Sequence, residues 1–362
     1  MEWSIGPFHP LLPGPMRLSL VLDGEVVRGA KVEGGFARIG LAEAMRRATW
    51  AQGVVLVGRL DPEAALFGEW AYCLALEQAF GIEAPPRARA IRVILAELSR
   101  IAAHLGRLSV IAQAAGSGPA FHFMLRERER VFDLCELVTG SRRSPAFVRV
   151  GGVRDDVTEG FLERLAELCH RLQRGVLEYN ELLTYNEAFV RRVAGRAVIT
   201  EAMVRRHGIT GIPARVFDRG ADLRWKGAPG YDLIRQEEAP QPESRGARGD
   251  LHQRFVMRLQ EILQSVGILQ ELSGRLPDGP FRVGGEFSKV PAGTHAAAVE
   301  APRGRLSIEV VSDGGPGPAD IRMAAPSQAL VAALPDCLYG VPFEDLGLAM
   351  ASLDLHVGEV DQ

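Results

Sequence analysis

Cysteine is scarce in this chain of 362 residues, which has only 4. No two of them form a CxxC pair, so a local zinc or iron–sulfur cradle and a disulfide framework are both excluded. The scarcity fits a reducing, cytoplasmic setting. The cysteines lie far apart in the sequence, at Cys73, Cys135, Cys169 and Cys337.

A surplus of charge of either sign is also missing, because 42 Lys and Arg stand against 45 Asp and Glu. Phosphate binding requires a clustered basic surplus, so no nucleic-acid partner is expected. The N-terminus has no basic region followed by an apolar stretch, and no signal peptide is expected. The longest uncharged run, 108–125, contains Gln113, Pro119 and His122 and is a poor membrane span.

Generic catalytic motifs are absent as well: there is no HExxH, no P-loop and no GxSxG. Gly34, Gly35 and Gly40 lack the spacing and the βα context of a dinucleotide-binding loop. The Gly-Pro stretch 314–318 predicts only a hairpin turn. Any chemistry therefore has to come from the arrangement of separate residues.

Apolar spacing predicts an α+β, mainly α protein, with a long-helix bundle core and small β elements at the N- and C-terminal ends. An alternating strand at 16–22 is followed by a tight turn at Asp23-Gly24 and a return strand. Glycines and prolines mark the helix limits, and Thr158 is expected to cap one helix. Helices are expected at 63–80, 87–115, 119–138, 158–185 and 250–272, and further strands at 305–312 and 320–323.

Composition shifts divide the chain into three expected segments. Residues 1–60 form a β-rich N-terminal segment, and 61–275 form the helical core. Within that core, 227–249 mixes Pro, Gly and charge as a linker does. Residues 276–362 form a C-terminal β/α segment that returns to the core.

Charged residues on the helix expected at 87–115 have two interpretations. Glu97, Arg100 and His104 lie at positions i, i+3 and i+7, so they share one helix face. A solvated outer stripe is the simpler interpretation, since charged side chains are mostly exposed. The alternative is a buried ionic network where the helix meets a redox centre, which makes Arg100 and His104 candidate cofactor-binding residues.

Other polar residues have the same two interpretations. At least half of the residues in the charged run 126–130 are expected to be exposed to solvent. His122, between two phenylalanines, predicts a partly buried imidazole held by a hydrogen bond. His9 lies in a proline-rich turn, where a structural role is usual, although polar residues on turns are over-represented in functional sites.

Short motifs follow one another in a fixed order over nearly the whole chain: GPFHP (6–10), AYCLALE (71–77), GIEAPPRA (81–88), ELSRI (97–101), GGVRDD (151–156), LPDGP (276–280), VEAPRG (299–304), VSDG (311–314), SLD (352–354) and GEVD (358–361). In this order they resemble the D subunit of NADH-quinone oxidoreductase. That family is the large subunit at the quinone-facing tip of complex I and is related to the large subunit of membrane-bound [NiFe] hydrogenases.

The resemblance implies a [NiFe]-hydrogenase-large-subunit-like fold and an electron-transfer subunit of a membrane-associated, complex-I-like NADH-quinone oxidoreductase. It implies three kinds of partner: a small iron–sulfur subunit, a protein like the C subunit of complex I, and membrane-arm subunits. The chain would lie peripherally on the cytoplasmic face of the cell membrane. It would bind no cofactor alone: quinone would occupy the site, the [4Fe–4S] cluster would lie in the partner, and NAD(H) would bind elsewhere in the complex.

Departures from the family pattern fall where the family does its chemistry. Pro13 stands in place of a second His, Pro62 in place of a Tyr, Ser144-Pro145 in place of a His-His pair, and Ala114 in place of an Asp. Proline cannot replace the proton or hydrogen-bond chemistry of His or Tyr. The two CxxC pairs that hold nickel in hydrogenases are also absent, so no metal ligand is predicted.

The resemblance also names candidate site residues. Arg59 matches the family arginine that sits against the partner's [4Fe–4S] cluster, where a cation stabilises the reduced state and raises the potential. His9 and Asp61 are the catalytic candidates, expected to line the cavity. Glu97 and Arg100, together with Arg126, are expected to form an interior network that holds the core helices.

A second hypothesis is a non-catalytic structural or assembly subunit of a hydrogenase-like membrane complex, which keeps the fold but has lost the substrate and nickel sites. The replaced His and Tyr positions are what that hypothesis predicts. The two hypotheses differ in whether other proton donors occupy the pocket in place of the replaced His and Tyr residues. His122, Tyr72 and Glu69 are the candidates for that role.

Overall fold

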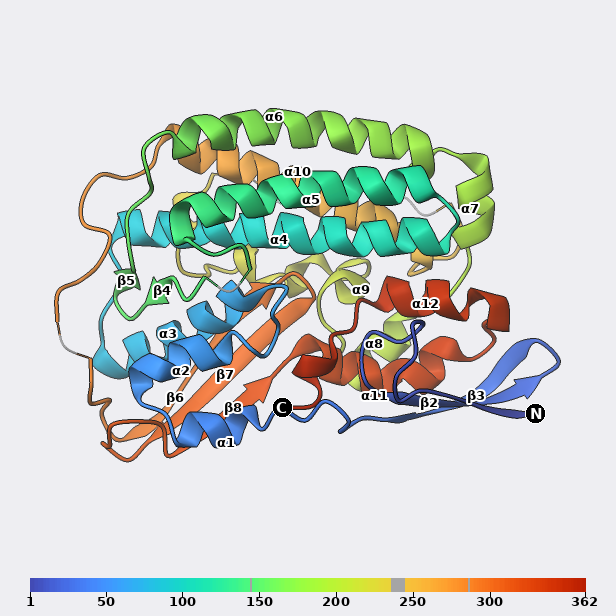
Figure 1. Cartoon of the computed structure of the whole chain (residues 1–362), viewed down its shortest axis with the longest axis horizontal. Coiled ribbons are helices and arrows are strands. Elements are labelled where there is room, and N and C mark those ends of the chain that lie inside the picture. Colours follow the sequence, from blue (N-terminus) through green and yellow to red (C-terminus); the bar gives the residue numbers. More distant parts are fainter. Residues whose placement is uncertain (144, 236–244, 286) are drawn as a thin grey trace.

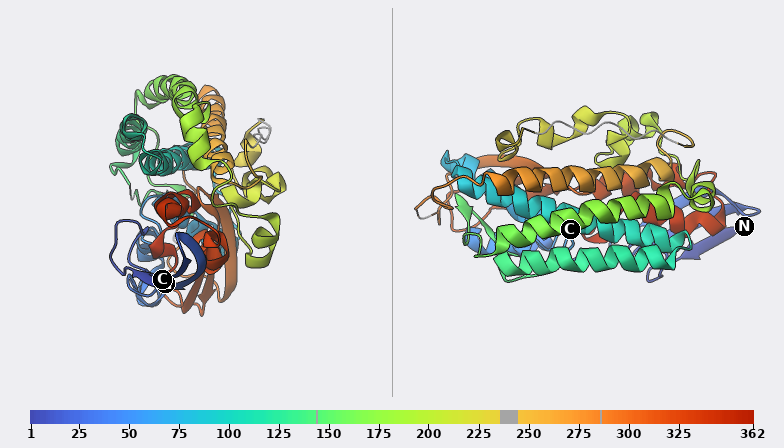
Figure 2. Two further views of the ribbon diagram at one scale, coloured as in Figure 1. Left: turned by 90° about the vertical axis from the view of Figure 1, so that its right-hand side faces the viewer. Right: turned by 90° about the horizontal axis from the view of Figure 1, so that it is seen from above.

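The computed structural model describes residues 1–143, 145–235, 245–285 and 287–362. Long helices form one layer along the longest axis of the molecule, and short helices and sheets form a second layer beneath them (Figure 1). Figure 2 shows the same two layers end-on, and from above its helices lie side by side. The predicted class, α+β and mainly α with small β elements toward both ends, is confirmed.

The upper layer consists of α4 (Pro86–Ala114), α5 (Gly118–Thr139), α6 (Phe161–Tyr179) and α10 (Leu251–Gly274). Proline in the first turn starts α4 and α5, and the Asp250 side chain caps α10 by accepting the N–H of Gln253. The cap predicted at Thr158 is wrong, because α6 begins after Gly160 and only the Thr158 carbonyl accepts the Phe161 N–H. The α-helical part of α6 also stops before 185, and a π-helical turn (Asn180–Thr184) follows it.

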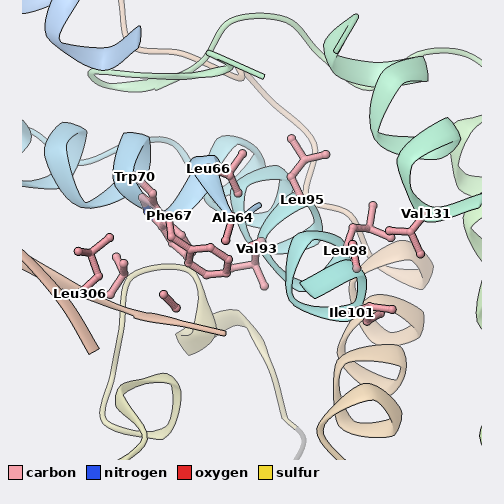
Figure 3. Close-up of a cluster of buried hydrophobic side chains, with 14 of the residues drawn as sticks. Ala64, Leu66, Phe67, Trp70, Val93, Leu95, Leu98, Ile101, Val131 and Leu306 are labelled. Carbon is pink, nitrogen blue, oxygen red and sulfur yellow. The ribbon is translucent and has the colours of Figure 1, made fainter. Parts of the chain in front are cut away.

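Helix α4 is enclosed by other elements along most of its length. It packs against α5 and α10 and against α12 (Leu346–Leu353). Figure 3 shows apolar side chains of α3 (Ala65–Phe80), α4 and α5 gathered in one cluster, with Leu306 at its edge. Because neighbours cover several faces of α4, a polar stripe on this helix ends up inside the molecule.

The lower layer contains two antiparallel sheets of three strands each, whose central strands β2 and β7 alternate between buried and more exposed residues. The N-terminal sheet runs β1 (Glu2–Ile5), β2 (Arg17–Asp23), β3 (Val26–Glu33), and Gly24 forms the predicted turn with a φ of +60°. The C-terminal sheet runs β6 (Gly293–Ala301), β7 (Gly304–Ser312), β8 (Asp320–Ala324), and residues 314–318 connect its last two strands as predicted. The N-terminal hairpin extends at one end of the molecule (Figure 1).

Short elements complete the structure. Helices α1 (Leu41–Arg46) and α2 (Trp50–Val57) lead into α3, and a small ladder pairs β4 (Val148–Arg149) with β5 (Gly152–Val153). The remaining helices are α7 (Glu187–Val193), α8 (Glu201–His207), α9 (Ile212–Arg215), α11 (Pro326–Leu338) and the 3₁₀ turns Arg219–Ala221, Leu223–Trp225, Tyr231–Leu233, Phe343–Asp345 and Val357–Glu359.

The largest hydrophobic cluster includes side chains from all three segments expected from the sequence. Leu41, Ile94 and Ile308 all belong to it, as does Leu348 from the C-terminal helix α12. A second cluster joins the N-terminal sheet to α11 and α12. Part of the linker expected at 227–249 lies outside the described residues. In Figure 1 the C-terminus lies near the middle of the lower layer.

Candidate functional site

The loop after α2 carries Arg59 and Asp61, whose side chains differ in burial. A capping box between Thr49 and Gln52 starts α2, and the buried Leu60 anchors the loop that follows it. Asp61 is only 6% exposed, whereas Arg59 is exposed. Among the described residues, the Arg59 side chain has no hydrogen-bond or ion-pair partner.

Asp61 belongs to a group of buried charges centred on Arg303, in the turn between β6 and β7. The guanidinium donates to Asp61, to Glu63 (2.7 Å) and to Asp354 (3.2 Å). Burial opposes its charge, but these three carboxylates outweigh burial and raise the pKa of Arg303 well above its usual value. The arginine therefore fixes acidic residues from two separate parts of the chain, the loop that carries Asp61 and Glu63 and the C-terminal segment that carries Asp354.

The C-terminal segment adds a histidine and a carboxyl group. His356 Nε2 lies 4.0 Å from Asp61 Oδ1, and the buried Glu359 accepts hydrogen bonds from the hydroxyl and the N–H of Ser327. Burial, reinforced by the charge of Asp61, raises the pKa of Glu359 to about 7. We call Asp61, Glu63, Arg303, Asp354, His356 and Glu359 the edge cluster.

Two arginines connect the edge cluster to the long helices. Nε of Arg107, on α4, lies 2.7 Å from Asp354 Oδ1, and Arg258, on α10, lies 3.6 Å from Oδ2. Burial would raise the pKa of Asp354, but the three guanidinium groups of Arg107, Arg303 and Arg258 lower it far below its usual value. Asp354 is therefore the anionic link between the sheet turn and the helix layer.

A second group of buried charges lies between α4 and α10. Glu97, Arg100 and His104 are all 0% exposed. Glu97 accepts from Arg100 (3.3 Å), from Arg224 (3.3 Å) and from Tyr231, while Glu261 accepts from Arg215 (2.7 Å). The interpretation of Glu97, Arg100 and His104 as a solvated outer stripe is therefore wrong, and their interpretation as part of a buried ionic network is confirmed. We call this set the interior network: Glu97, Arg100, His104, Arg215, Arg224, Glu261 and Glu300.

Electrostatics explains why the interior network is stable when ionised. Burial would raise the pKa of Glu97, but the positive charges of Arg100 and Arg224 hold it below its usual value. Burial lowers the pKa of His104, which opposes the effect of its partner Glu261, 3.0 Å away. These contacts place Arg100 and His104 against groups of this chain, so their role toward a cofactor stays a prediction.

Three polar residues expected from the sequence lie at the surface. His9 is exposed, and its Nδ1 accepts the N–H of Leu11 at 3.2 Å. Arg126 was expected in the interior, but its side chain is 53% exposed because it occupies the outer face of α5. The partly buried, hydrogen-bonded imidazole expected at His122 is also wrong: His122 is exposed and lies edge-on against Phe121.

The other two candidates for refilling the pocket are buried and already in use. Glu69 accepts the backbone N–H groups of 146, 147 and 148, and burial raises its pKa to about 7. The Tyr72 hydroxyl donates to the Trp50 carbonyl at 3.3 Å. Ser144 lies outside the described residues, whereas its neighbour Pro145 lines a crevice of about 30 Å³ with Glu63, enough for roughly one water molecule.

Sequence reasoning missed most of the edge cluster. Arg303, Asp354 and Glu359 all lie inside motifs that carried the resemblance, but these motifs were used as markers of ancestry. His356 had no such signal. The signal that could have found these residues is the cost of burying charge. An arginine in a strand turn and acidic residues in an apolar C-terminal segment are costly to bury unless they pair with opposite charges.

Comparisons with known proteins agree with this geometry. The family model described as the respiratory-chain NADH dehydrogenase 49 kDa subunit matches residues 115–287 and 281–362. The D subunit of NADH-quinone oxidoreductase from Desulforamulus reducens is 34% identical over 99% of this chain and 97% of its own length. The corresponding protein of Carboxydothermus hydrogenoformans is 36% identical over the same shares. The D subunit of F420H2 dehydrogenase from Methanosarcina mazei is 33% identical over 99% of this chain and 96% of its own length.

Proposed function

The chain belongs to the family of the respiratory-chain NADH dehydrogenase 49 kDa subunit, a complex-I-like oxidoreductase subunit, and we propose that its edge cluster borders the electron-transfer site of such a complex. In this proposal a small iron–sulfur protein docks over Arg59. Its [4Fe–4S] cluster passes electrons to a quinone bound between the two subunits.

The observation that carries the proposal is the contrast between two cationic residues, Arg59 and Arg303. Arg303 is buried and holds three carboxylates, whereas Arg59 is exposed on the same loop as Asp61 and has no partner among the described residues. A cation at an exposed edge is available to a negatively charged group of another subunit. Beside an iron–sulfur cluster it would stabilise the reduced state and raise the potential.

A membrane-side partner is supported by the N-terminal loop around His9. Phe8 is 78% exposed and Leu11 40% exposed, and on the loop after β3 Ile39 is 48% exposed. Apolar side chains gathered on a surface commonly mark an interaction site. No helix in the described part of the chain is long and apolar enough to span a bilayer. From the family to which the chain belongs, we infer peripheral attachment on the cytoplasmic side, through a protein like the C subunit of complex I and through membrane-arm subunits.

The electron donor is assigned to other subunits. The relatives are named both for NADH and for F420H2, although they share this subunit over nearly its full length. A donor site on this chain would have to accommodate both chemistries. NAD(H) or another donor therefore belongs to a different module, and this chain binds no cofactor alone.

The test is native purification from membranes through a tag on this chain, with subunits identified and iron and nickel quantified in the same sample. The expected result is recovery with a small [4Fe–4S] subunit and membrane proteins, with iron present and nickel absent. Recovery of a free, metal-free chain would contradict the proposal.

A second candidate function is favoured by Pro13 and Pro62. These residues exchange no proton, as expected of a subunit that holds a hydrogenase-like membrane complex together without a substrate site. The same purified assembly separates the two candidates. Reduction of the quinone analogue decylubiquinone by the intact complex supports the electron-transfer role, and an iron-containing complex that reduces no quinone supports the structural role.

A further inference from the structure

The C-terminal segment lies against both loops in which proline replaces a proton donor. A Cβ added to Gly14, next to Pro13, would lie 2.9 Å from Val357. A Cβ added to Gly358 would lie 2.8 Å from the carbonyl oxygen of Leu60, two residues before Pro62. Contacts this close leave no room for other side chains. The segment 356–358 therefore lies where the two loops meet.

His356 places an imidazole at that meeting point. Its Nε2 faces Asp61 Oδ1 at 4.0 Å, and its buried Nδ1 has no hydrogen-bond partner among the described residues. Its backbone N–H donates to Ser327 Oγ at 3.0 Å, which holds the main chain from which the ring projects. The side chain is 22% exposed, so the ring is held by the protein but can still be reached from outside.

The charges that face this ring come from the other members of the edge cluster. Burial lowers the pKa of His356, and the charge of Asp61 acts against burial. Arg303 lowers it further, whereas Glu63 and Asp354 raise it. Glu359 lies three residues further along the chain, and burial raises its pKa to about 7. The ring therefore lies in a cluster of charged residues, one of which, Glu359, has its pKa raised to about 7.

We propose that His356 is the proton donor of this site, replacing the family's His and Tyr at the positions of Pro13 and Pro62. The proposal rests on the proposed function. The Nε2–H bond of the imidazolium breaks as an O–H bond forms on a carbonyl oxygen of the bound quinone. The two electrons come one at a time from the partner's [4Fe–4S] cluster, which the electron donor of the complex reduces again between the two transfers. The neutral ring regains a proton from solvent and delivers the second one, so two electrons and two protons complete the reduction. Asp61 keeps the ring oriented between transfers.

The experiment uses the complete complex purified from membranes, with His356→Gln compared with His170→Gln. His170 is an exposed residue on α6, so the control makes the same substitution outside the edge cluster. Two readouts are taken: decylubiquinone reduction against pH, and the infrared difference spectrum on reduction after ¹⁵N labelling of histidine. His356→Gln is expected to reduce the rate about 100-fold, the usual size for a lost general acid. It is also expected to remove the imidazole band that His170→Gln and the unchanged protein retain.

The outcomes separate this inference from the function on which it rests. If the unchanged complex reduces decylubiquinone and His356→Gln keeps its rate, its pH profile and the imidazole band, the role of His356 is contradicted while the proposed function stands. If the unchanged complex reduces no quinone, both are contradicted. If His356→Gln fails to assemble, the labelled unchanged complex decides. A redox-linked histidine band that shifts in Asp61→Asn supports the inference, whereas a band that does not shift, or the absence of any histidine band, overturns it.

Discussion

The interior network and the edge cluster are both groups of carboxylates and guanidinium groups inside the protein. Only the interior network is closed, in the sense that all of its side chains are buried. In the interior network each carboxylate has partners within the chain, as Glu97 and Glu261 do with the arginines around them. The edge cluster holds its acids equally firmly through Arg303. At its outer side, however, the side chains of His356 and Glu63 are 22% and 35% exposed, and Arg59 on the same loop as Asp61 has no partner among the described residues.

The difference separates the structural role of the interior network from the chemical role that we propose for the edge cluster. A closed set of buried charges holds helices in register, because removing any one partner leaves an uncompensated charge. An open set can accept a charge or a proton from outside. Arg107 on α4 and Arg258 on α10 both pair with Asp354, so the helices that carry part of the interior network also hold the edge cluster in place.

The largest expected effect breaks the closed set. Glu261→Gln removes the anion that Arg215 and His104 contact inside the protein, and we expect a loss of about 3–5 kcal/mol in the free energy of unfolding. Urea unfolding of the chain followed by circular dichroism measures it. Glu43→Gln is the control, since Glu43 pairs with Arg47 on the surface of α1, and a change within about 0.5 kcal/mol is expected. Equal effects of the two substitutions would contradict the closed network.

A smaller effect is expected when the edge cluster loses one acid. Asp61→Asn leaves Arg303 with Glu63 and Asp354, so the expected loss of unfolding free energy is about 1.5–3 kcal/mol. The substitution also removes the negative charge that raises the pKa of His356, so this pKa should fall further. Reaction of the neutral imidazole with diethylpyrocarbonate, followed against pH by peptide mass spectrometry, measures the shift. An unchanged midpoint would show that Asp61 does not act on the ring.

The smallest expected effect concerns Glu359, whose pKa is raised from 4.5 to about 7 by burial and by Asp61. A raised pKa means that its favourable contribution is complete below pH 4.5, is lost as the pH rises from 4.5 to 7, and does not change further above pH 7. Glu359→Gln removes this loss, so the stability advantage of the variant over the unchanged protein should grow by about 1 kcal/mol between pH 5 and pH 6 and should level off above pH 7. Glu344→Gln, on the exposed neighbouring turn, is the control. Parallel stability curves for Glu359→Gln and the unchanged protein would exclude this titration.

The long helices could be predicted from the sequence because each has strong periodicity, although the limits of α6 could not, since its first residue follows Gly160 and it continues into a π-helical turn. Strand β6 could not, since its Ala296-Ala297-Ala298 run has no β-branched alternation and the strand forms only by pairing with β7. The stripe on α4 was ambiguous for a similar reason. Spacing shows that Glu97 and Arg100 share a face, but only tertiary packing decides whether that face is covered.

The candidate site was predictable only in part. Arg59 and Asp61 followed from the resemblance, and the structure shows that Asp61 is buried and Arg59 exposed. Arg303 pairs with Asp61 across 242 positions of sequence, a separation that no local pattern encodes. His356 is separated from Asp61 by an even longer stretch of chain. The sequence around Pro13 and Pro62 therefore gives no indication of the proton donor that we propose at His356.

The most direct test of the central claim is the midpoint potential of the partner's [4Fe–4S] cluster, measured by redox titration with electron paramagnetic resonance in the purified complex. Arg59→Ala and Arg59→Lys are compared with Arg126→Ala, which removes an exposed arginine from α5. Losing about 1.4 kcal/mol of charge stabilisation corresponds to about 59 mV for one electron. We predict a shift of that order to lower potential in Arg59→Ala, a smaller shift in Arg59→Lys and none in Arg126→Ala. An unchanged potential in Arg59→Ala, with the complex intact, would contradict the claim that this edge faces the cluster.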